Sequence, residues 1–276
     1  MYTEALAPPP EALSTVDRIN RHTMSRAVRE YEVVIAEGLN TQERAALELV
    51  GDVAFTGRIL DLGMGAGRTV RPLRSLTDQY VGVDYTAEMV QYCRQRFRGV
   101  RFEHLDARAL SAFEAQSFDL VFFSCNGISM VDHAGRLSIL SEAMRVLAPG
   151  GAFVFSTCNR NSLEFEAVFQ WPGFERTLNP LKWVPRIARF VGQALLRTRN
   201  RLRLKRHEVH TPEYVMLNDV FHHYSTMIYY IDLQSQVRQL NAAGFARGVI
   251  ALDQRGRRAN AQTRDGTLIF VSRKPK

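Results

Sequence analysis

The sequence of 276 residues has few cysteines, and they are not arranged as metal ligands or disulfide partners. The three, Cys93, Cys125 and Cys158, are widely spaced, without a Cys-x-x-Cys pair and without the cysteine and histidine spacing of a zinc site. These absences argue against a disulfide framework and against a structural metal. They favour a protein of a reducing compartment, the cytoplasm.

Long apolar runs are also absent. No stretch approaches the roughly 20 residues that a membrane-spanning helix requires. The first residues, MYTEALAPPPEALS, contain an acid and three prolines where a secretory leader has basic and then apolar residues. We therefore expect a cytoplasmic protein with no membrane span, long enough for one α/β domain with an added or inserted piece.

The most informative stretch that is present is residues 58–71, RILDLGMGAGRTVR. The apolar pair Ile59–Leu60 predicts the end of a buried strand, and a helix is expected over residues 68–76. Three glycines alternate between them: Gly63, Gly65 and Gly67. Because glycine tolerates positive φ and lets a ligand lie against the backbone, the loop predicts a nucleotide-like ligand.

The spacing of these glycines indicates the kind of nucleotide. A dinucleotide fingerprint has glycines at its first, third and sixth positions, whereas here they are first, third and fifth, and the sixth is Arg68. Asp61 stands two positions before the first glycine, where it would repel a pyrophosphate and attract a cationic amino-acid group. The pattern argues against a nicotinamide or flavin and favours a positively charged ligand.

This loop resembles motif I of the class I S-adenosylmethionine-dependent methyltransferases, and four later segments up to Cys158 resemble further motifs of that family in order. An ordered set of this kind is harder to obtain by chance than a lone glycine loop. The resemblance implies a Rossmann-like, doubly wound α/β fold with a seven-stranded, mostly parallel sheet and an antiparallel last strand. It also implies S-adenosylmethionine as the cofactor and no metal.

Further strand ends supply the residues that the resemblance assigns to the cofactor. Asp84 ends a strand 21 residues beyond Gly63, about where nucleotide folds place a carboxylate on the ribose. A strand over residues 100–105 leads to Asp106, the expected reader of adenine. Either carboxylate has an alternative role as a helix cap, although Thr86 is expected to cap the helix after Asp84. The remaining members of the expected set are Tyr85, Met89, Ala107 and Ser124.

The fourth strand, residues 118–123, ends in Ser-Cys-Asn-Gly, which resembles motif IV. The two prolines and aromatic residue that base-modifying aminomethyltransferases carry here are missing, so nucleobase amines are poor candidates for the acceptor. Asn126 is expected to orient a substrate hydroxyl, or simply to form the turn. The clustered acids of a catechol-type metal site are also missing.

Three histidines are candidates for a general base. His133 comes first, because it follows Asp132, the expected cap of a helix that runs to about residue 147. His222 and His223 come next, and in a predicted strand over residues 221–232 they would project on opposite sides. A structural role is the alternative for each of them.

The chain is expected to divide into four parts. Residues 1–53 would form a tail and a helical cap, in which Tyr31 would touch the methionine end of the cofactor or merely be a half-buried helix residue. Residues 54–158 would form the cofactor-binding core and residues 159–215 a basic, lid-like insertion. Residues 216–276 would complete the sheet with a helix over 233–243 and strands near 246–252 and 267–272.

The insertion concentrates the positive charge of the chain. Between Lys182 and Arg206 there are nine basic residues and no acidic one, against a net charge of +8 for the whole chain. An amphipathic helix is expected from Pro185, and an extended segment beyond it would place five alternating cations, Arg197 to Lys205, on one side. Three aromatic residues of the insertion, Trp171, Phe174 and Trp183, would line an apolar chamber or form the insertion's own small core.

Three interpretations of this basic segment remain open. It is a substrate lid with solvated charges, a holder of a phosphate or carboxylate of the substrate, or a surface for acidic lipid or RNA. We expect a methyltransferase for a small-molecule acceptor at oxygen, nitrogen or carbon. The alternatives are an RNA or protein methyltransferase that docks through the insertion, with nucleic acid the less favoured partner, and a non-catalytic cofactor-binding partner protein.

Overall fold

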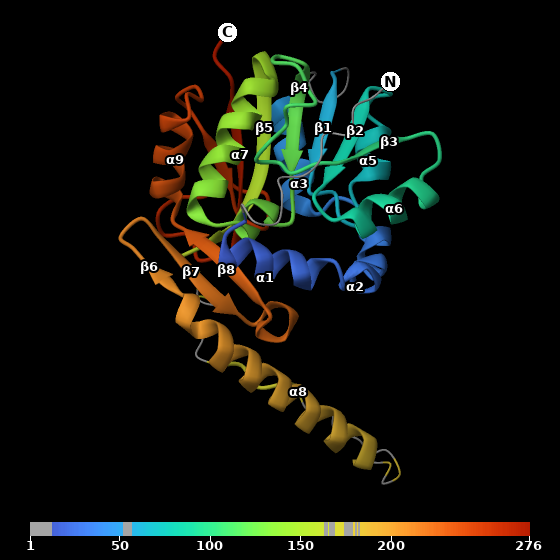
Figure 1. Cartoon of the computed structure of the whole chain (residues 1–276). Helices are drawn as coiled ribbons and strands as arrows, with labels where there is room; N and C mark the ends of the chain where they lie inside the picture. The colour runs from blue at the N-terminus through green and yellow to red at the C-terminus, as the bar shows by residue number, and fades with distance from the viewer. Residues whose placement is uncertain are drawn as a thin grey trace.

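A computed structural model of the chain describes residues 13–51, 57–162, 165, 169–173, 179, 181 and 183–276. One central sheet carries helices on both faces, and a long helix projects from this body (Figure 1). The chain therefore has the expected α/β class. Phe174 and Lys182 lie outside the described residues.

Seven strands form the core of the sheet. Five are parallel, in the order β3-β2-β1-β4-β5: β1 (Ile59–Leu62), β2 (Tyr80–Asp84), β3 (Arg101–His104), β4 (Phe118–Phe123) and β5 (Leu147–Asn159). The last strand, β10 (Thr267–Arg273), runs antiparallel to β5 and pairs with β9 (Ile250–Leu252). The order reverses between β1 and β4, which is where open α/β sheets bind their ligands.

Helices cover both faces because the core strands are apolar on both sides. Every residue of β1 and β2 is buried, as in parallel strands covered twice. Ile59 faces a layer with α3 (Thr41–Val50), α5 (Val70–Arg74) and α6 (Ala87–Arg96). Leu60 faces the other layer, with α7 (His133–Val146) and α9 (Leu233–Ala242).

Three more strands extend the sheet beyond the expected seven. They are β6 (Val209–His210), β7 (Tyr214–Asp219) and β8 (Thr226–Ile231). β7 lies between the other two and pairs antiparallel with each. β8 joins the core where Cys158 and Asn159 of β5 pair in parallel with Tyr230 and Ile231. β5 is thus longer than expected and carries a second, smaller sheet at its carboxyl end.

The expected strand over residues 221–232 is wrong in its first half. Phe221–Tyr224 form a short 3-10 turn, η7, in which His222, His223 and Tyr224 have positive φ angles of 46°, 58° and 61°. The aromatic and polar alternation continues through this turn, so the sequence does not reveal it. The two histidines therefore do not alternate across a strand.

The N-terminal helices lie across the carboxyl ends of the parallel strands (Figure 1). They are α1 (Thr15–Met24), α2 (Val28–Glu32) and the 3-10 segment η2 (Val33–Glu37). Ser14 and Asp17 form a capping box that starts α1. Asn20 holds α1 in place, because its buried amide donates to the carbonyls of Met130 and Met227 and accepts from the Met227 N–H.

In the described part of the basic insertion, one long helix stands where a helix and an extended segment were expected. α8 (Trp183–Leu204) has 22 residues and is followed by the turn η6 (Lys205–His207). Because the arginines lie on a helix, Arg197 and Arg201 face one side and Arg199 and Arg203 another. Trp171 and Trp183 are 65% and 48% exposed. None of the helices in the described ranges is long and apolar enough to span a bilayer.

Candidate active site

A cavity of about 140 Å³ opens at the carboxyl ends of β1, β2 and β4. Its floor comes from the turns that follow these strands and includes Gly63, Gly65, Asp84, Ala107 and Ser124. Its cover comes from the N-terminal helices and η7 and includes Met24, Tyr31, Phe221 and His222. The cavity lies at the reversal point of the sheet, as expected for a ligand site in this class of fold.

The three glycines of the loop have different roles. All have positive φ, of 60°, 55° and 90° for Gly63, Gly65 and Gly67. A Cβ on Gly67 would lie 2.5 Å from the Phe97 ring, and this glycine packs against α6 instead of lining the cavity. A Cβ on Gly65 would meet nothing within 4 Å, so its open face is turned to the cavity. Only Gly63 and Gly65 are thus positioned to contact a ligand.

Asp84 lies on the cavity floor and organises the loop around it. Its carboxylate accepts hydrogen bonds from the N–H groups of Gly65 (2.9 Å) and Thr86 (2.8 Å), and burial raises its pKa. Thr86 precedes α6 but makes no side-chain cap, contrary to expectation, and its own N–H donates to Asp84. Each carboxylate oxygen retains a lone pair for a further donor. Tyr85 and Met89 extend the same wall.

Asp61 does not line the cavity. It is buried beneath the loop, where Thr69 and Tyr80 donate their hydroxyl protons to its Oδ2 atom at 2.5 and 2.8 Å. Burial raises its pKa to about 7 in spite of these bonds. Its Oδ1 atom has no hydrogen-bond partner in the described part of the chain. Direct contact with a ligand remains a prediction for Asp61.

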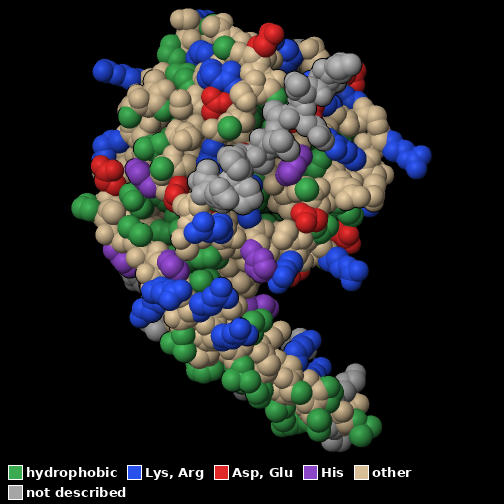
Figure 2. All heavy atoms as spheres, in the orientation of Figure 1, with side chains coloured by type: hydrophobic (Ala, Val, Ile, Leu, Met, Phe, Trp, Pro, Cys, Tyr) green, Lys and Arg blue, Asp and Glu red, His purple; other side chains and the backbone are tan. Residues whose placement is uncertain are grey.

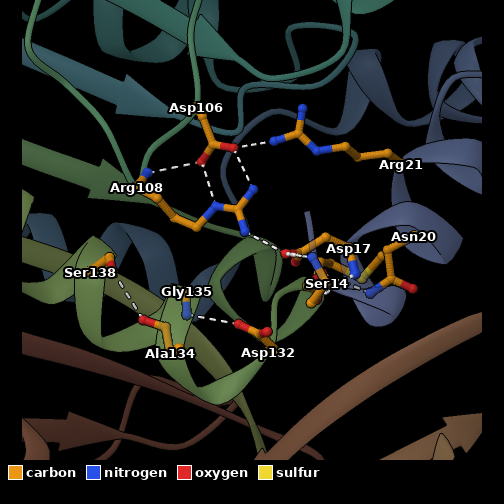
Figure 3. A network of polar contacts seen from close by, with 11 residues as sticks. Ser14, Asp17, Asn20, Arg21, Asp106, Arg108, Asp132, Ala134, Gly135 and Ser138 are labelled. Carbon is orange, nitrogen blue, oxygen red and sulfur yellow. Dashed lines mark hydrogen bonds and ion pairs between the residues drawn. The ribbon is translucent and has the colours of Figure 1, made fainter. Parts of the chain in front are cut away.

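Asp106 is engaged by two arginines and also does not line the cavity. Its carboxylate binds Arg108, and Arg21 of α1 reaches across to the same group (Figure 3). Burial acts to raise the pKa of Asp106, but Arg108 and then Arg21 hold it below its usual range. The guanidinium of Arg21 lies 4.6 Å from the ring centre of Tyr85. The neighbour of Asp106, Ala107, is the residue that reaches the cavity wall.

Behind β4 the chain makes a tight turn that exposes polar atoms to the cavity. Cys125 and Asn126 both have positive φ, of 50° and 58°, and strain of this kind concentrates at functional sites. The amide of Asn126 donates to Thr267 Oγ1 at 3.0 Å, while its Oδ1 atom is buried without a partner among the described residues. Ser124 Oγ accepts from Arg68 at 3.1 Å.

Arg68, the residue that breaks the dinucleotide pattern, has a structural explanation. Its guanidinium forms a two-pronged ion pair with the buried carboxylate of Glu43 on α3, at 2.6 and 2.8 Å. It thereby ties the glycine loop to α3 and to the turn after β4. Glycine at this position could not make that connection.

His133 does not line the cavity, and its role as a base stays a prediction. Its ring stacks on Tyr214 with centroids 4.4 Å apart, and its Nδ1 atom lies 2.8 Å from the Tyr229 hydroxyl. Burial and the charge of Arg136 lower its pKa. His133 therefore belongs to the packing between α7 and the small sheet. His223 also points elsewhere, toward Arg197 of α8.

His222 is the histidine that faces the cavity. Its Nδ1 atom lies 3.0 Å from the carboxylate of Glu30, and its Nε2 atom lies 3.3 Å from the hydroxyl of Tyr31. Burial raises the pKa of Tyr31 to about 12, so this phenol stays protonated. A carboxylate, an imidazole and a phenol thus form a chain that ends in the cavity. Glu30 was not expected here, because it is 192 positions from His222 and no local pattern links the two.

Comparison with known proteins gives the same family as the motifs. Residues 59–151 match the family model described as "Methyltransferase domain". The chain is 31% identical over 145 residues to a ubiquinone biosynthesis O-methyltransferase of Roseobacter denitrificans, a match that covers 50% of this chain and 54% of that protein. The chain thus spans about half the length of the curated relatives it matches.

Solved structures share the fold at low sequence identity. The 1,6-didemethyltoxoflavin-N1-methyltransferase of Burkholderia thailandensis, solved with its substrate and S-adenosylhomocysteine, has a TM-score of 0.58 and 14% identity over 100% of this chain and 99% of that one. The CcbJ methyltransferase of Streptomyces caelestis has a TM-score of 0.58 and 17% identity over 87% and 92%. Residues 59–151 thus match a methyltransferase domain, and the chain shares the fold of these solved methyltransferases.

Proposed function

We propose that this protein transfers a methyl group from S-adenosylmethionine to a hydroxyl of a small-molecule acceptor. The proposal rests on one observation. A single cavity has a floor of strand-end turns, as nucleotide sites do, and a cover that includes a histidine. Gly65 and Asp84 belong to the floor, and His222 belongs to the cover. The relative named as an O-methyltransferase supports the choice of oxygen.

The residues present fit the proposed cofactor. Gly63 and Gly65 offer backbone at positive φ, Asp84 offers a carboxylate for the ribose, and Met89 offers an apolar wall. The unpartnered Oδ1 atom of Asp61 lies under the loop, where a cationic amino-acid group would be stabilised. When bound, the cofactor supplies the electrophilic methyl group, and the chemistry of that group is its own.

The protein's part in the reaction is orientation and removal of one proton. Alignment of an acceptor with a bound methyl donor supplies about 7 to 11 kcal/mol in favourable cases. His222 is suited to take the proton of the Tyr31 hydroxyl at Nε2 while the Tyr31 oxygen takes the proton of the acceptor's hydroxyl, and Glu30 at Nδ1 then stabilises the imidazolium. Asn126, with its free Oδ1 acceptor, is suited to orient the acceptor's hydroxyl.

The proposal requires Arg21 to move when the nucleoside enters. Arg21 occupies the space between Tyr85 and Asp106, where the adenine ring is expected. The cavity of about 140 Å³ is also smaller than the ~300–1,000 Å³ of ordinary ligand sites. A flexible arginine on α1 can swing out at small cost, and Asp106 then becomes available to the adenine amino group.

Binding and turnover together test the proposal. Calorimetry with S-adenosylhomocysteine should give saturable binding, and NAD should not bind. Turnover is then measured as release of S-adenosylhomocysteine, with pairs of small aromatic acceptors that differ only in hydroxyl or amine. Binding of NAD in place of the nucleoside would overturn the proposal. Equal or faster turnover of the amines would overturn the assignment to oxygen.

A further inference from the structure

A second cavity, of about 890 Å³, lies beside the first, between α1 and α8. We call it the basic cleft. Five arginines line it: Arg18, Arg26, Arg199, Arg203 and Arg206. Four histidines line it as well: His22, His207, His222 and His223. Its single acid is Glu30, which is engaged by His222. The cleft is thus a concave surface of almost uniform charge, and such shapes concentrate counter-ions of the opposite sign.

The arginines of the cleft gather around one hollow, with Glu30 as the acid beside them. Some surface arginines outside the cleft pair with acids, as Arg74 does with Asp78 and Arg145 with Glu142. In the cleft, Arg26, Arg199 and Arg203 have no carboxylate partner within the described part of the chain. Figure 2 shows Lys, Arg and His side chains gathered where α8 leaves the body. Unpaired like charges that face one another are unfavourable unless an anion offsets them.

The basic cleft and the cofactor cavity share a wall. His222 lines both, and Tyr31 contacts it on the cavity side while Glu30 contacts it on the cleft side. A molecule seated in the cleft therefore ends next to the imidazole that we propose as the base. The charge of the cleft therefore indicates which chemical group the acceptor carries.

We propose that the basic cleft binds a phosphate-type group of the acceptor, so that the substrate is a phosphorylated molecule whose hydroxyl reaches past His222 into the cofactor cavity. Guanidinium groups match phosphate oxygens with two parallel hydrogen bonds, and several of them suit a multiply charged anion. This inference rests on the proposed function for the position of the reacting hydroxyl. The anion site itself does not depend on it.

Inorganic pyrophosphate is the probe for the site. Calorimetry and thermal unfolding of the full chain should show that it binds and raises Tm by a few degrees. In the double variant Arg199→Gln with Arg203→Gln, its Kd should rise at least tenfold. The control is Arg247→Gln with Arg258→Gln, which removes two exposed charges far from the cleft and should leave the Kd unchanged.

The outcomes separate this inference from the proposed function. S-adenosylhomocysteine should bind equally well to the wild type and both double variants, since none of the four arginines lines the cofactor cavity. Absence of pyrophosphate binding, or equal loss in the control, would overturn the anion site whatever the cofactor result. Salt-sensitive binding of an RNA oligomer without pyrophosphate binding would also overturn it, in favour of nucleic acid.

Vesicles identify the source of the phosphate group. Flotation with phosphatidylglycerol vesicles but not with phosphatidylcholine vesicles, lost in the Arg199 and Arg203 double variant, would support a lipid headgroup as the ligand. Pyrophosphate binding without flotation would support a water-soluble phosphorylated acceptor. Flotation that is unchanged in the double variant, together with no effect of that variant on pyrophosphate, would contradict the cleft as the anion site.

Discussion

The floor and the cover of the cofactor cavity are built in different ways. The floor comes from successive strand ends between Gly63 and Ser124, and local hydrogen bonds such as Gly65 to Asp84 shape it. The cover is held by contacts between residues about 190 to 210 positions apart, such as Tyr31 with His222 and Asn20 with Met227. The difference suggests a division of labour in which the floor binds the cofactor and the cover selects and activates the acceptor.

The largest effect is expected for the floor. Asp84→Asn removes the carboxylate charge and keeps one of the two oxygens that accept from the N–H groups of Gly65 and Thr86, so the affinity of the folded variant for S-adenosylhomocysteine should fall at least 100-fold. Calorimetry measures the affinity, and circular dichroism checks the fold. A folded variant with wild-type affinity would contradict the assignment of Asp84 to the ribose.

A smaller effect, on turnover alone, is expected for the cover. His222→Gln should lower kcat about 100- to 10,000-fold, the range for loss of a general base, and leave S-adenosylhomocysteine affinity within about twofold. The matched control is His133→Gln, which should keep its turnover because His133 is outside the cavity. If the two variants lost turnover equally, His222 would have no special role.

Arg21 extends from α1 in the cover to Asp106 beside the floor, and its removal should strengthen the binding of the cofactor. Arg21→Ala frees Tyr85 and Asp106, so the Kd of S-adenosylhomocysteine should fall about three- to tenfold. Arg18→Ala, also on α1 but outside the cofactor cavity, is the control and should change nothing. A weaker affinity in Arg21→Ala would mean that Arg21 holds the cofactor and does not compete with it.

The last effect is on stability and not on binding or turnover, and it is a pH dependence that comes from Asp61 beneath the floor. Burial raises the pKa of Asp61 from 3.8 to about 7, so between these values the folded protein keeps a proton that the unfolded chain has released. This contribution to stability is full below about pH 4 and is lost as pH rises to about 7, by at most about 1.4 kcal/mol per pH unit. Asp61→Asn should lack it. Denaturant unfolding from pH 4 to 8 measures the difference, and parallel profiles would contradict a raised pKa.

The same contrast explains what could be predicted from the sequence. The mostly parallel α/β sheet was predicted from the family resemblance. The cavity residues Gly63, Asp84 and Met89 were predicted because strand ends and glycine spacing are local signals. The same kind of signal assigned Gly67, Asp106 and His133 to the site, but these three do not line the cavity. Gly67 packs against Phe97, Arg21 binds Asp106 and His133 stacks on Tyr214, and no local pattern records such contacts.

Of the cover, the N-terminal helices with Tyr31 were predicted, and the turn η7 was not, for a related reason. The turn η7 continues the alternation of a strand, and only its positive φ angles turn His222 toward Tyr31. The basic residues from Arg197 to Lys205 alternate in sequence as in a strand, but they lie on the helix α8 and in the turn η6. Glu30 became part of the site only because α2 lies over that turn.

The length of β5 has a consequence for how new specificities arise in this architecture. Its first part is bordered by β4 and its last two residues by β8, so one continuous strand holds both the nucleoside platform and the hairpin that carries η7. On the proposed function, exchange of the hairpin beyond Asn159 between homologous chains is expected to change the preference for the acceptor and to leave the binding of the methyl donor unchanged.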